Sequence, residues 1–159
     1  DIKAVMSYAL KTELSDSDSI ELEKASKDVQ ERIPKLNKSC LSLKQFLEKH
    51  PSIKKVYHPH ICPNFKKLMK GPDAYGCLLS FELTGGIEQA QRAYDALKTC
   101  KGPSFGTDFT LVSPYVLLAH YTELEWAARY GVKAQLLRVS VGLEPEDVLF
   151  ERFNEALLA

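Results

Sequence analysis

The chain has 159 residues, of which 21 are Lys or Arg and 21 are Asp or Glu, so its formal net charge at pH 7 is zero. A length between roughly 100 and 200 residues is typical of one domain, and 45% hydrophobic residues exclude wholesale disorder. The balanced charge gives no field that would collect nucleic acid or an anionic membrane surface. No apolar run reaches the roughly 18 residues of a membrane span. We therefore expect neither nucleic acid nor a membrane as a partner.

The chain begins with Asp1 rather than Met, and its first residues lack the basic start and apolar block of a signal peptide. We therefore expect it to be a piece of something longer. Its four cysteines, Cys40, Cys62, Cys77 and Cys100, form no Cys-x-x-Cys pair. In a chain of this size and composition they favour reduced thiols in a cytoplasmic protein over a disulfide framework.

The nearest approach to a metal signature is the alternation of His58, His60 and Cys62, which would line one side of an extended segment. Pro59 and Pro63 favour a surface loop that leaves a strand instead. No second cluster of ligand types stands at zinc-like spacing, so we expect no metal site.

The first predicted element is a long helix. The polar run at residues 15–19 is rich in N-cap residue types and predicts a start at Ser17 or Asp18. Apolar side chains then recur every three or four positions from Leu22 to Leu47, which predicts one helix of about eight turns with a kink caused by Pro34 near residues 30–33. Such a helix lies across another body or forms a coiled-coil arm, and the lack of sustained e/g charge pairing favours the first.

Beyond residue 51 the period changes. Strands are predicted at residues 53–57, 75–83, 104–112 and 136–141, and helices at 87–98, 122–130 and from about 146 to 158, with a loop after the first strand. These elements predict an α+β fold: a small, mostly antiparallel sheet of about four strands, with helices packed on one face and the long kinked helix leading in. We divide the chain into an N-terminal segment with its lead-in helix, residues 1–50, and an α+β domain, residues 51–159.

Self-contained catalytic motifs are missing from the sequence: it has no Gly-x-Ser-x-Gly, no P-loop and no His-Glu-x-x-His. Two weaker candidates remain. The turn at residues 102–107 has backbone donors and hydroxyls that could hold an anion, or it is only a bulged strand start. Arg138 stands in an apolar strand on the same face as Leu136 and Ser140, where it either forms a salt bridge or presents its planar fork to a carboxylate or phosphate.

A resemblance bears on that choice. Residues 137–147, Leu-Arg-Val-Ser-Val-Gly-Leu-Glu-Pro-Glu-Asp, resemble the closing Arg-x-Ser-x-Gly-x-Glu segment of the Cys/Met-metabolism enzymes that depend on pyridoxal phosphate (PLP). Residues 56–59, 76–86 and 104–111 resemble three further stretches of that family in the same order, so the resemblance covers roughly residues 26–158. The family contains cystathionine γ-synthase, the cystathionine lyases and O-acetylhomoserine sulfhydrylase. The run Gly-Pro-Ser-Phe-Gly-Thr-Asp-Phe-Thr-Leu at residues 102–111 resembles its fungal cystathionine γ-synthase branch.

The resemblance implies the C-terminal domain of a fold-type I PLP enzyme. In that domain Arg138 matches the arginine that clamps the substrate α-carboxylate, and Ser104 matches a serine that contacts the same carboxylate. The Schiff-base lysine, in its Ser-x-Thr-Lys setting, and the aspartate that pairs with the pyridine nitrogen would lie in a preceding larger domain. We therefore expect no catalytic or cofactor-binding residue here, no PLP bound to this chain alone, and no activity of the isolated chain.

For the full enzyme, the resemblance implies a homo-oligomer that joins O-acyl homoserine and cysteine into cystathionine in methionine biosynthesis. Departures from the family pattern leave the exact reaction open, because Pro103, Thr107 and Phe109 replace a common glutamate, a glycine and a second common glutamate. A cystathionine lyase or an O-acetylhomoserine sulfhydrylase remains an alternative. So does a non-catalytic interaction module, or an α+β module that binds amino acids through Arg138 and Ser104.

Overall fold

The computed structural model describes residue 2 and residues 14–159. The chain divides into two compact units, residues 1–31 and residues 32–159. The predicted boundary between residues 50 and 51 stays a prediction. Among the described residues, no helix has the length and apolar character needed to cross a membrane.

The long predicted helix is two helices, α2 (Asp16–Ser26) and α3 (Val29–Lys49). α2 begins one or two residues before the predicted start at Ser17 or Asp18, because the hydroxyl of Ser15 caps it by accepting a hydrogen bond from the backbone N–H of Asp18 at 3.1 Å. The prediction of one continuous helix is wrong: the interruption falls at residues 27–28, upstream of residues 30–33. α3 starts at Val29 and contains Pro34 in its second turn, so the helix lacks the backbone hydrogen bond that residue 34 would otherwise donate.

The unit formed by residues 32–159 contains one sheet of five strands: β1 (Ile53–Tyr57), β2 (Leu78–Leu83), β3 (Cys100–Lys101), β4 (Leu111–Ser113) and β5 (Leu137–Ser140). Their order across the sheet is β1-β2-β5-β4-β3. Neighbouring strands are antiparallel except for β3 and β4, which are parallel. The predicted α+β class is confirmed, with five strands where about four were expected.

The predicted strand at residues 104–112 is largely wrong. Only Leu111 and Val112 join the sheet, as part of β4, and residues 102–110 form a loop. Pro103 has no backbone N–H to give to a ladder, and Gly106 has a φ of 78°, which turns the chain out of an extended path. Below, residues 102–110 are called the serine loop.

Short helices fill the connections. η1 (Pro59–Ile61) and α4 (Pro63–Leu68) follow β1, α5 (Gly86–Ala96) follows β2, and α6 (Tyr115–Ala119), η2 (Tyr121–Glu123) and α7 (Leu124–Arg129) link β4 to β5. α8 (Glu146–Leu157) closes the chain. The helices predicted at 87–98, 122–130 and 146–158 are found within a few residues of their predicted bounds. α4 and α6 were not predicted, since five or six residues are too few to show a helical period.

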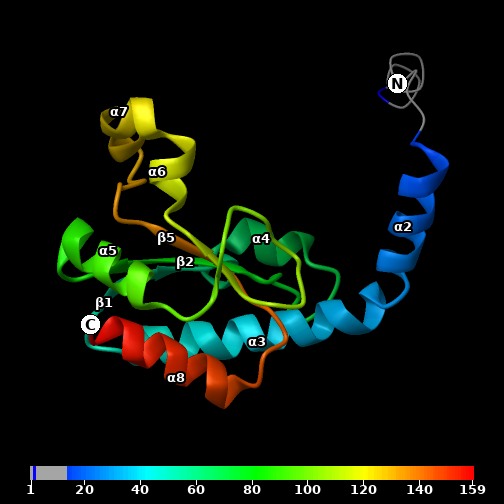
Figure 1. Cartoon of the computed structure of the whole chain (residues 1–159), viewed down its shortest axis with the longest axis horizontal. Helices are drawn as coiled ribbons and strands as arrows, with labels where there is room; N and C mark the ends of the chain where they lie inside the picture. Colours follow the sequence, from blue (N-terminus) through cyan, green and yellow to red (C-terminus); the bar gives the residue numbers. More distant parts are fainter. Residues whose placement is uncertain (1, 3–13) are drawn as a thin grey trace. The chain divides into compact units, whose positions relative to one another are not determined.

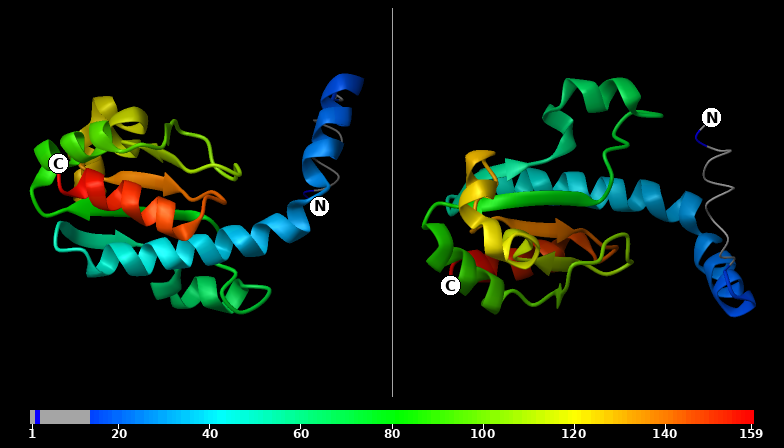
Figure 2. Two further views of the ribbon diagram at one scale, coloured as in Figure 1. Left: turned by 60° about the horizontal axis from the view of Figure 1, so that its bottom comes forward. Right: turned by 90° about the horizontal axis from the view of Figure 1, so that it is seen from above.

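One face of the sheet carries the hydrophobic core. α3 and α8 run side by side along this face, and α5 lies next to α8 (Figures 1 and 2). α6 and α7 lie on the opposite side of the sheet in Figure 1. The predicted arrangement, with the main helices on one face, is therefore confirmed. The core side chains from the helices are Cys40, Leu43, Leu47, Ala90, Ala93, Leu149, Phe153, Ala156 and Leu157, and those from the strands include Leu79, Phe81, Leu83, Val112, Leu137 and Val139.

Candidate functional site

The face of the sheet opposite the core is polar at its centre. On β5, Leu137 and Val139 belong to the core, so strand alternation turns Arg138 and Ser140 to the other face. Arg138 lies directly between Ser80 of β2 and Ser113 of β4 in the register of the sheet. A row of two serines and one arginine therefore crosses three adjacent strands.

The guanidinium of Arg138 is held by neutral groups. Its Nη2 donates to the backbone carbonyls of Pro103 and Ser104, the second at 3.4 Å, and its Cζ lies 5.0 Å from the centre of the Tyr115 ring. No carboxylate among the described residues lies within salt-bridge distance of Arg138, and its buried Nε has no hydrogen-bond partner among them. The sequence left two roles open for Arg138, a salt bridge to a neighbour or a fork that binds an anion. Among the described residues, Arg138 forms no salt bridge. The positive charge of Arg138 is uncompensated within the described part of the chain.

Both candidate residues meet at this point. Ser104 contacts Arg138 through its backbone carbonyl rather than its hydroxyl, and its side chain is exposed. The hydroxyl of Ser113, in the same row as Arg138, is buried and has no hydrogen-bond partner among the described residues. Buried polar atoms without partners are rare in proteins. Here two of them, on Arg138 and Ser113, lie on adjacent strands beside the serine loop.

The serine loop runs along β5 and its continuation, and hydrogen bonds join the two at regular steps. Arg138 bonds to the carbonyls of residues 103 and 104, and the hydroxyl of Ser140 accepts from the backbone N–H of Gly106 at 3.1 Å. Further along, the backbone N–H of Leu143 donates to the carbonyl of Asp108 at 2.7 Å. The two motifs that the sequence showed far apart are therefore one structural unit.

The far end of this unit is closed by three residues. The carboxylate of Glu144 accepts from both the backbone N–H and the hydroxyl of Thr110, each at 2.7 Å. The same hydroxyl accepts from the backbone N–H of Gly142 at 3.0 Å. A β-carbon at Gly142 would lie 2.4 Å from the carbonyl carbon of Phe109, so only glycine lets the loop approach this closely. Thr110 and Glu144 are called the Thr–Glu clasp below.

Sequence reasoning assigned no role to Tyr115, Thr110 or Glu144. The last two stand inside the motifs that carried the resemblance, Thr110 in residues 104–111 and Glu144 in residues 137–147. Tyr115 gave no sequence signal, since its position beneath Arg138 depends on the short helix α6.

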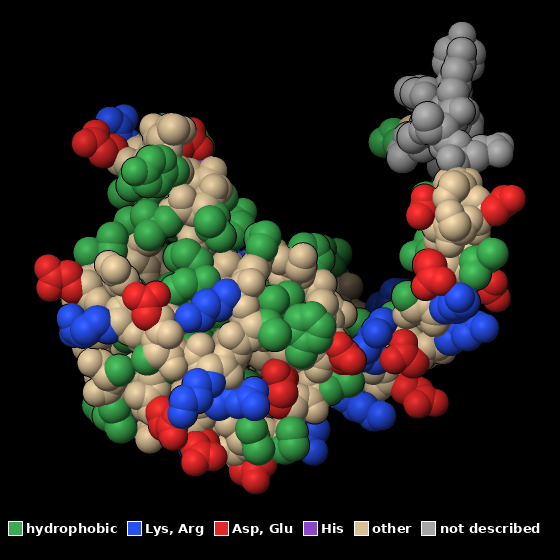
Figure 3. Space-filling model, in the orientation of Figure 1, with side chains coloured by type: hydrophobic (Ala, Val, Ile, Leu, Met, Phe, Trp, Pro, Cys, Tyr) green, Lys and Arg blue, Asp and Glu red, His purple; other side chains and the backbone are tan. Residues whose placement is uncertain are grey.

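Aromatic side chains continue outward from Tyr115 over α6 and α7. The ring of His120 lies 6.2 Å from that of Tyr115 and 6.4 Å from that of Trp126, and the Trp126 ring lies 5.1 Å from that of Tyr130. The Nδ1 of His120 lies 2.7 Å from a carboxylate oxygen of Glu123. Half or more of Trp126 and Tyr130 is exposed, and hydrophobic side chains gather over α6 and α7 in Figure 3.

Residues 3–158 match the family described as "Cys/Met metabolism PLP-dependent enzyme". The chain belongs to this family. Cystathionine gamma-synthase of Neurospora crassa is 42% identical over 159 residues, which cover 98% of this chain and 25% of that protein. Cystathionine gamma-synthase of Saccharomyces cerevisiae is 41% identical over 149 residues, 88% of this chain and 23% of that protein. L-methionine gamma-lyase of Fusobacterium nucleatum is 35% identical over 118 residues, 70% of this chain and 30% of that protein. The chain thus spans about a quarter of the length of the first two relatives.

PLP is the cofactor of this family. No lysine in the sequence stands in the Ser-x-Thr-Lys setting that the resemblance implies for the Schiff base. Lys101, the lysine nearest the serine loop in sequence, is occupied elsewhere: its Nζ donates to the carbonyl of Asp95 at 3.1 Å and lies 4.7 Å from the centre of the Tyr94 ring. What this part of a PLP-dependent family member offers is an arginine on a sheet, suited to an anion.

The segment with His58, His60 and Cys62 leaves the end of β1 as predicted, and Cys62 is exposed. His58 differs from the prediction because it is buried and caps the short helix η1, where its Nδ1 accepts from the backbone N–H of His60 at 3.3 Å. Burial first, then the charges of His60 and Lys44, lower the pKa of His58 to about 4. Among the described residues, no group of three or more His, Cys, Asp or Glu side chains is placed to hold a metal ion.

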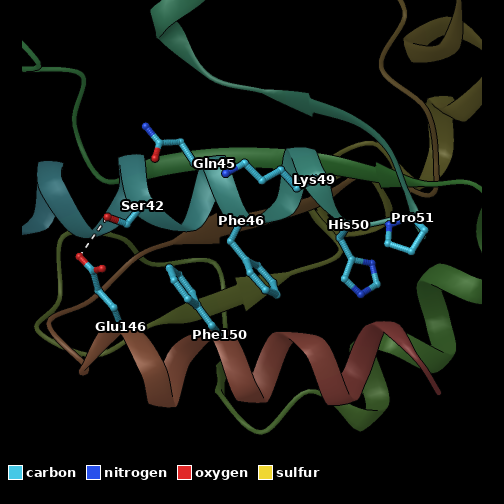
Figure 4. A pocket seen from close by; sticks show the side chains of 8 residues that line it. All are labelled: Ser42, Gln45, Phe46, Lys49, His50, Pro51, Glu146 and Phe150. Carbon is cyan, nitrogen blue, oxygen red and sulfur yellow. Dashed lines mark hydrogen bonds between the residues drawn. The ribbon is translucent and has the colours of Figure 1, made fainter.

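A groove of about 380 Å³ lies between α3 and α8, away from Arg138 (Figure 4). Phe46 and Phe150 stack across it with ring centres 4.8 Å apart, and the hydroxyl of Ser42 donates to the carboxylate of Glu146 at 3.0 Å. Neither predicted site residue lines this groove. The candidate site is therefore the polar face of the sheet, not this groove.

Proposed function

We propose that this chain is the C-terminal part of a longer cystathionine γ-synthase and binds the α-carboxylate of the amino-acid substrate. The observation that carries the proposal is the uncompensated charge of Arg138, fixed by two carbonyls and a ring with no carboxylate in reach among the described residues. A planar guanidinium forms paired hydrogen bonds with a carboxylate. The names of the two relatives that are 42% and 41% identical support the choice of reaction.

In the proposed reaction, the Cγ–O bond of an O-acyl homoserine breaks and a bond from Cγ to the sulfur of cysteine forms. The acyl group leaves as a carboxylic acid and takes up the thiol proton. PLP, when bound, supplies the electron sink for this substitution. Arg138 holds the α-carboxylate so that the reacting end of the substrate is correctly oriented, and Ser104 adds a contact to the same carboxylate.

The proposal has consequences for the rest of the protein. PLP and its Schiff-base lysine belong to a part outside these 159 residues, and the full enzyme is a homo-oligomer. The isolated chain binds no PLP and is inactive. All four cysteines of the chain are free thiols, which supports the proposed cytoplasmic location.

The test is a kinetic comparison in the full-length protein. Arg138→Lys keeps the charge but loses the bidentate fork, so kcat/KM for cystathionine formation from O-acyl homoserine and cysteine should fall. The expected loss of transition-state stabilisation is about 2–4 kcal/mol. Arg92→Lys, at an exposed position on α5, is the matched control and should leave kcat/KM unchanged. An unaltered kcat/KM in Arg138→Lys would remove Arg138 from the site.

A lyase is the second candidate, favoured by the L-methionine gamma-lyase that is 35% identical to this chain. It would use the same carboxylate contact and eliminate rather than replace the γ-substituent. Release of a 2-oxo acid from methionine or cystathionine alone, faster than cystathionine synthesis, would favour the lyase. An O-acetylhomoserine sulfhydrylase would instead turn over with sulfide in place of cysteine.

A non-catalytic module is the third candidate, because the chain spans only about a quarter of the catalytic relatives it matches. Calorimetry of O-acetylhomoserine with the 159-residue chain separates this from the enzyme proposal. Tight binding to the isolated chain would support an amino-acid-binding module. We expect none, and no visible absorption band after PLP is added.

A further inference from the structure

We propose that the Thr–Glu clasp, Thr110 with Glu144, is a positioning device that sets the carboxylate-binding arginine. The inference rests on the proposed function, since it assigns Arg138 to substrate binding. Neither clasp residue touches Arg138. Their effect passes through the serine loop, whose carbonyls at residues 103 and 104 accept from the guanidinium.

The clasp fixes its two partners more tightly than a single contact would. Both oxygens of Glu144 accept from one residue, Thr110, and the Thr110 hydroxyl is at once donor to Glu144 and acceptor from Gly142. Thr110 is fully buried and Glu144 is half-buried. Hydrogen bonds to a charged acceptor in such surroundings are stronger and more directional than neutral ones.

Stability alone does not require such a clasp. Apolar side chains of similar shape often replace buried polar pairs at no cost in stability. The pair fixes the register between the serine loop and β5, because only one alignment of the two lets Glu144 accept from both donors of Thr110. A slip of the loop along β5 would break these bonds and carry the carbonyl of Ser104 away from Arg138.

The path from clasp to arginine is continuous. Thr110 lies opposite Gly142 and Glu144, Asp108 opposite Leu143, and Gly106 opposite Ser140. The last step is Arg138 itself, opposite residues 103 and 104. Because Nη2 of Arg138 is tied to loop carbonyls and not to a carboxylate, the position of the loop decides where the fork points.

The decisive comparison is Thr110→Val with Thr110→Ser in the full-length protein. Valine keeps the shape and removes the hydroxyl, whereas serine keeps it. With the loop released, KM for the O-acyl homoserine should rise about tenfold or more in Thr110→Val, since small misplacements of a binding group are costly. We expect kcat and the visible absorption band of the bound cofactor to change little in Thr110→Val. In Thr110→Ser, KM should stay close to its wild-type value.

A second readout follows the loop without any turnover. Hydrogen exchange measured by mass spectrometry on the same full-length proteins should be faster across residues 103–110 in Thr110→Val and in Glu144→Gln, and near wild type in Thr110→Ser. Glu144→Gln serves where valine prevents folding, because it removes the charge and keeps the shape. A folded Thr110→Val protein with faster loop exchange and an unchanged KM would overturn the inference.

A failure of the proposed reaction can be distinguished from a failure of the clasp inference. If the wild-type protein forms no cystathionine, that reaction is refuted, and the inference is then tested by the affinity for glycine, the simplest amino-acid carboxylate, read from the cofactor band. Weaker glycine binding in Thr110→Val and Arg138→Lys, but not in Thr110→Ser, would support the clasp. Equal affinity in all three would overturn it.

Discussion

Replacing Gly142 by alanine is the sharpest test of how the serine loop meets β5. The added β-carbon would lie 2.4 Å from the carbonyl carbon and 2.6 Å from the Cα of Phe109, and 2.6 Å from a carboxylate oxygen of Glu144. The first two atoms are backbone. No change of rotamer can relieve those contacts, so the loop itself has to move.

The loss of stability in Gly142→Ala follows from how far the backbone at Phe109 has to move. Carbon atoms in contact settle at roughly 3.5 Å, so the backbone at Phe109 must retreat by about 1 Å. Overpacking of this kind costs about 1–3 kcal/mol. The same movement pulls Thr110 away from Glu144, and each hydrogen bond weakened there costs about 1 kcal/mol. We expect the free energy of unfolding to fall by about 2–4 kcal/mol in Gly142→Ala.

Urea unfolding of the 159-residue chain, followed by far-ultraviolet circular dichroism, measures this loss. Gly71→Ala is the matched control, because a β-carbon at Gly71 would meet no atom within 4 Å. It should change the free energy of unfolding by less than about 0.5 kcal/mol. A Gly142→Ala protein as stable as the Gly71→Ala control would refute the close approach of the loop to β5.

Three further outcomes are expected. In the full-length protein, Tyr115→Leu should raise KM for the amino-acid substrate about two- to fivefold by removing the ring beneath Arg138, whereas Tyr115→Phe should not. Because burial lowers the pKa of His58 to about 4, the unfolded chain alone takes up this proton between about pH 6.5 and 4. The free energy of unfolding should therefore fall as pH drops through that window, by up to about 3 kcal/mol, and His58→Asn should flatten the fall in urea titrations. Burial also raises the pKa of the Cys40 thiol to about 12, so iodoacetamide should modify exposed Cys62 first, and equal rates by mass spectrometry would contradict the structure.

The sequence predicted best where side-chain alternation and burial agree. Leu137 and Val139 alternate with Arg138, and the strand, its two faces and the polar position of the arginine follow from that pattern alone. The last helix was equally clear, since Pro145 and the acids after it mark its start. Both cases depend on local chemistry, which neighbouring residues carry in full.

The misses have a shared cause: each feature is fixed by distant contacts. Residues 104–110 were predicted as part of a strand, yet Gly106 and Thr110 donate to side chains more than 30 positions away, at Ser140 and Glu144. The apolar period from Leu22 to Leu47 continues through residues 27–28, where the structure has a break between α2 and α3. Only the second half of this stretch is buried. Leu22 is 60% exposed and Leu47 is fully buried. A helical period thus predicts helix, and it does not tell how far the core extends.

The neutral surroundings of Arg138 explain why its role could not be chosen from sequence. A salt bridge and a ligand-binding fork need the same residue on the same strand, and they differ only in what lies within about 4 Å of the guanidinium. That difference is made by the serine loop, which brings carbonyls to Arg138, and by α6, which brings Tyr115. A carbonyl orients the guanidinium without neutralising it. The fork is therefore held in place while its charge stays available, and this combination suits the binding of an incoming carboxylate.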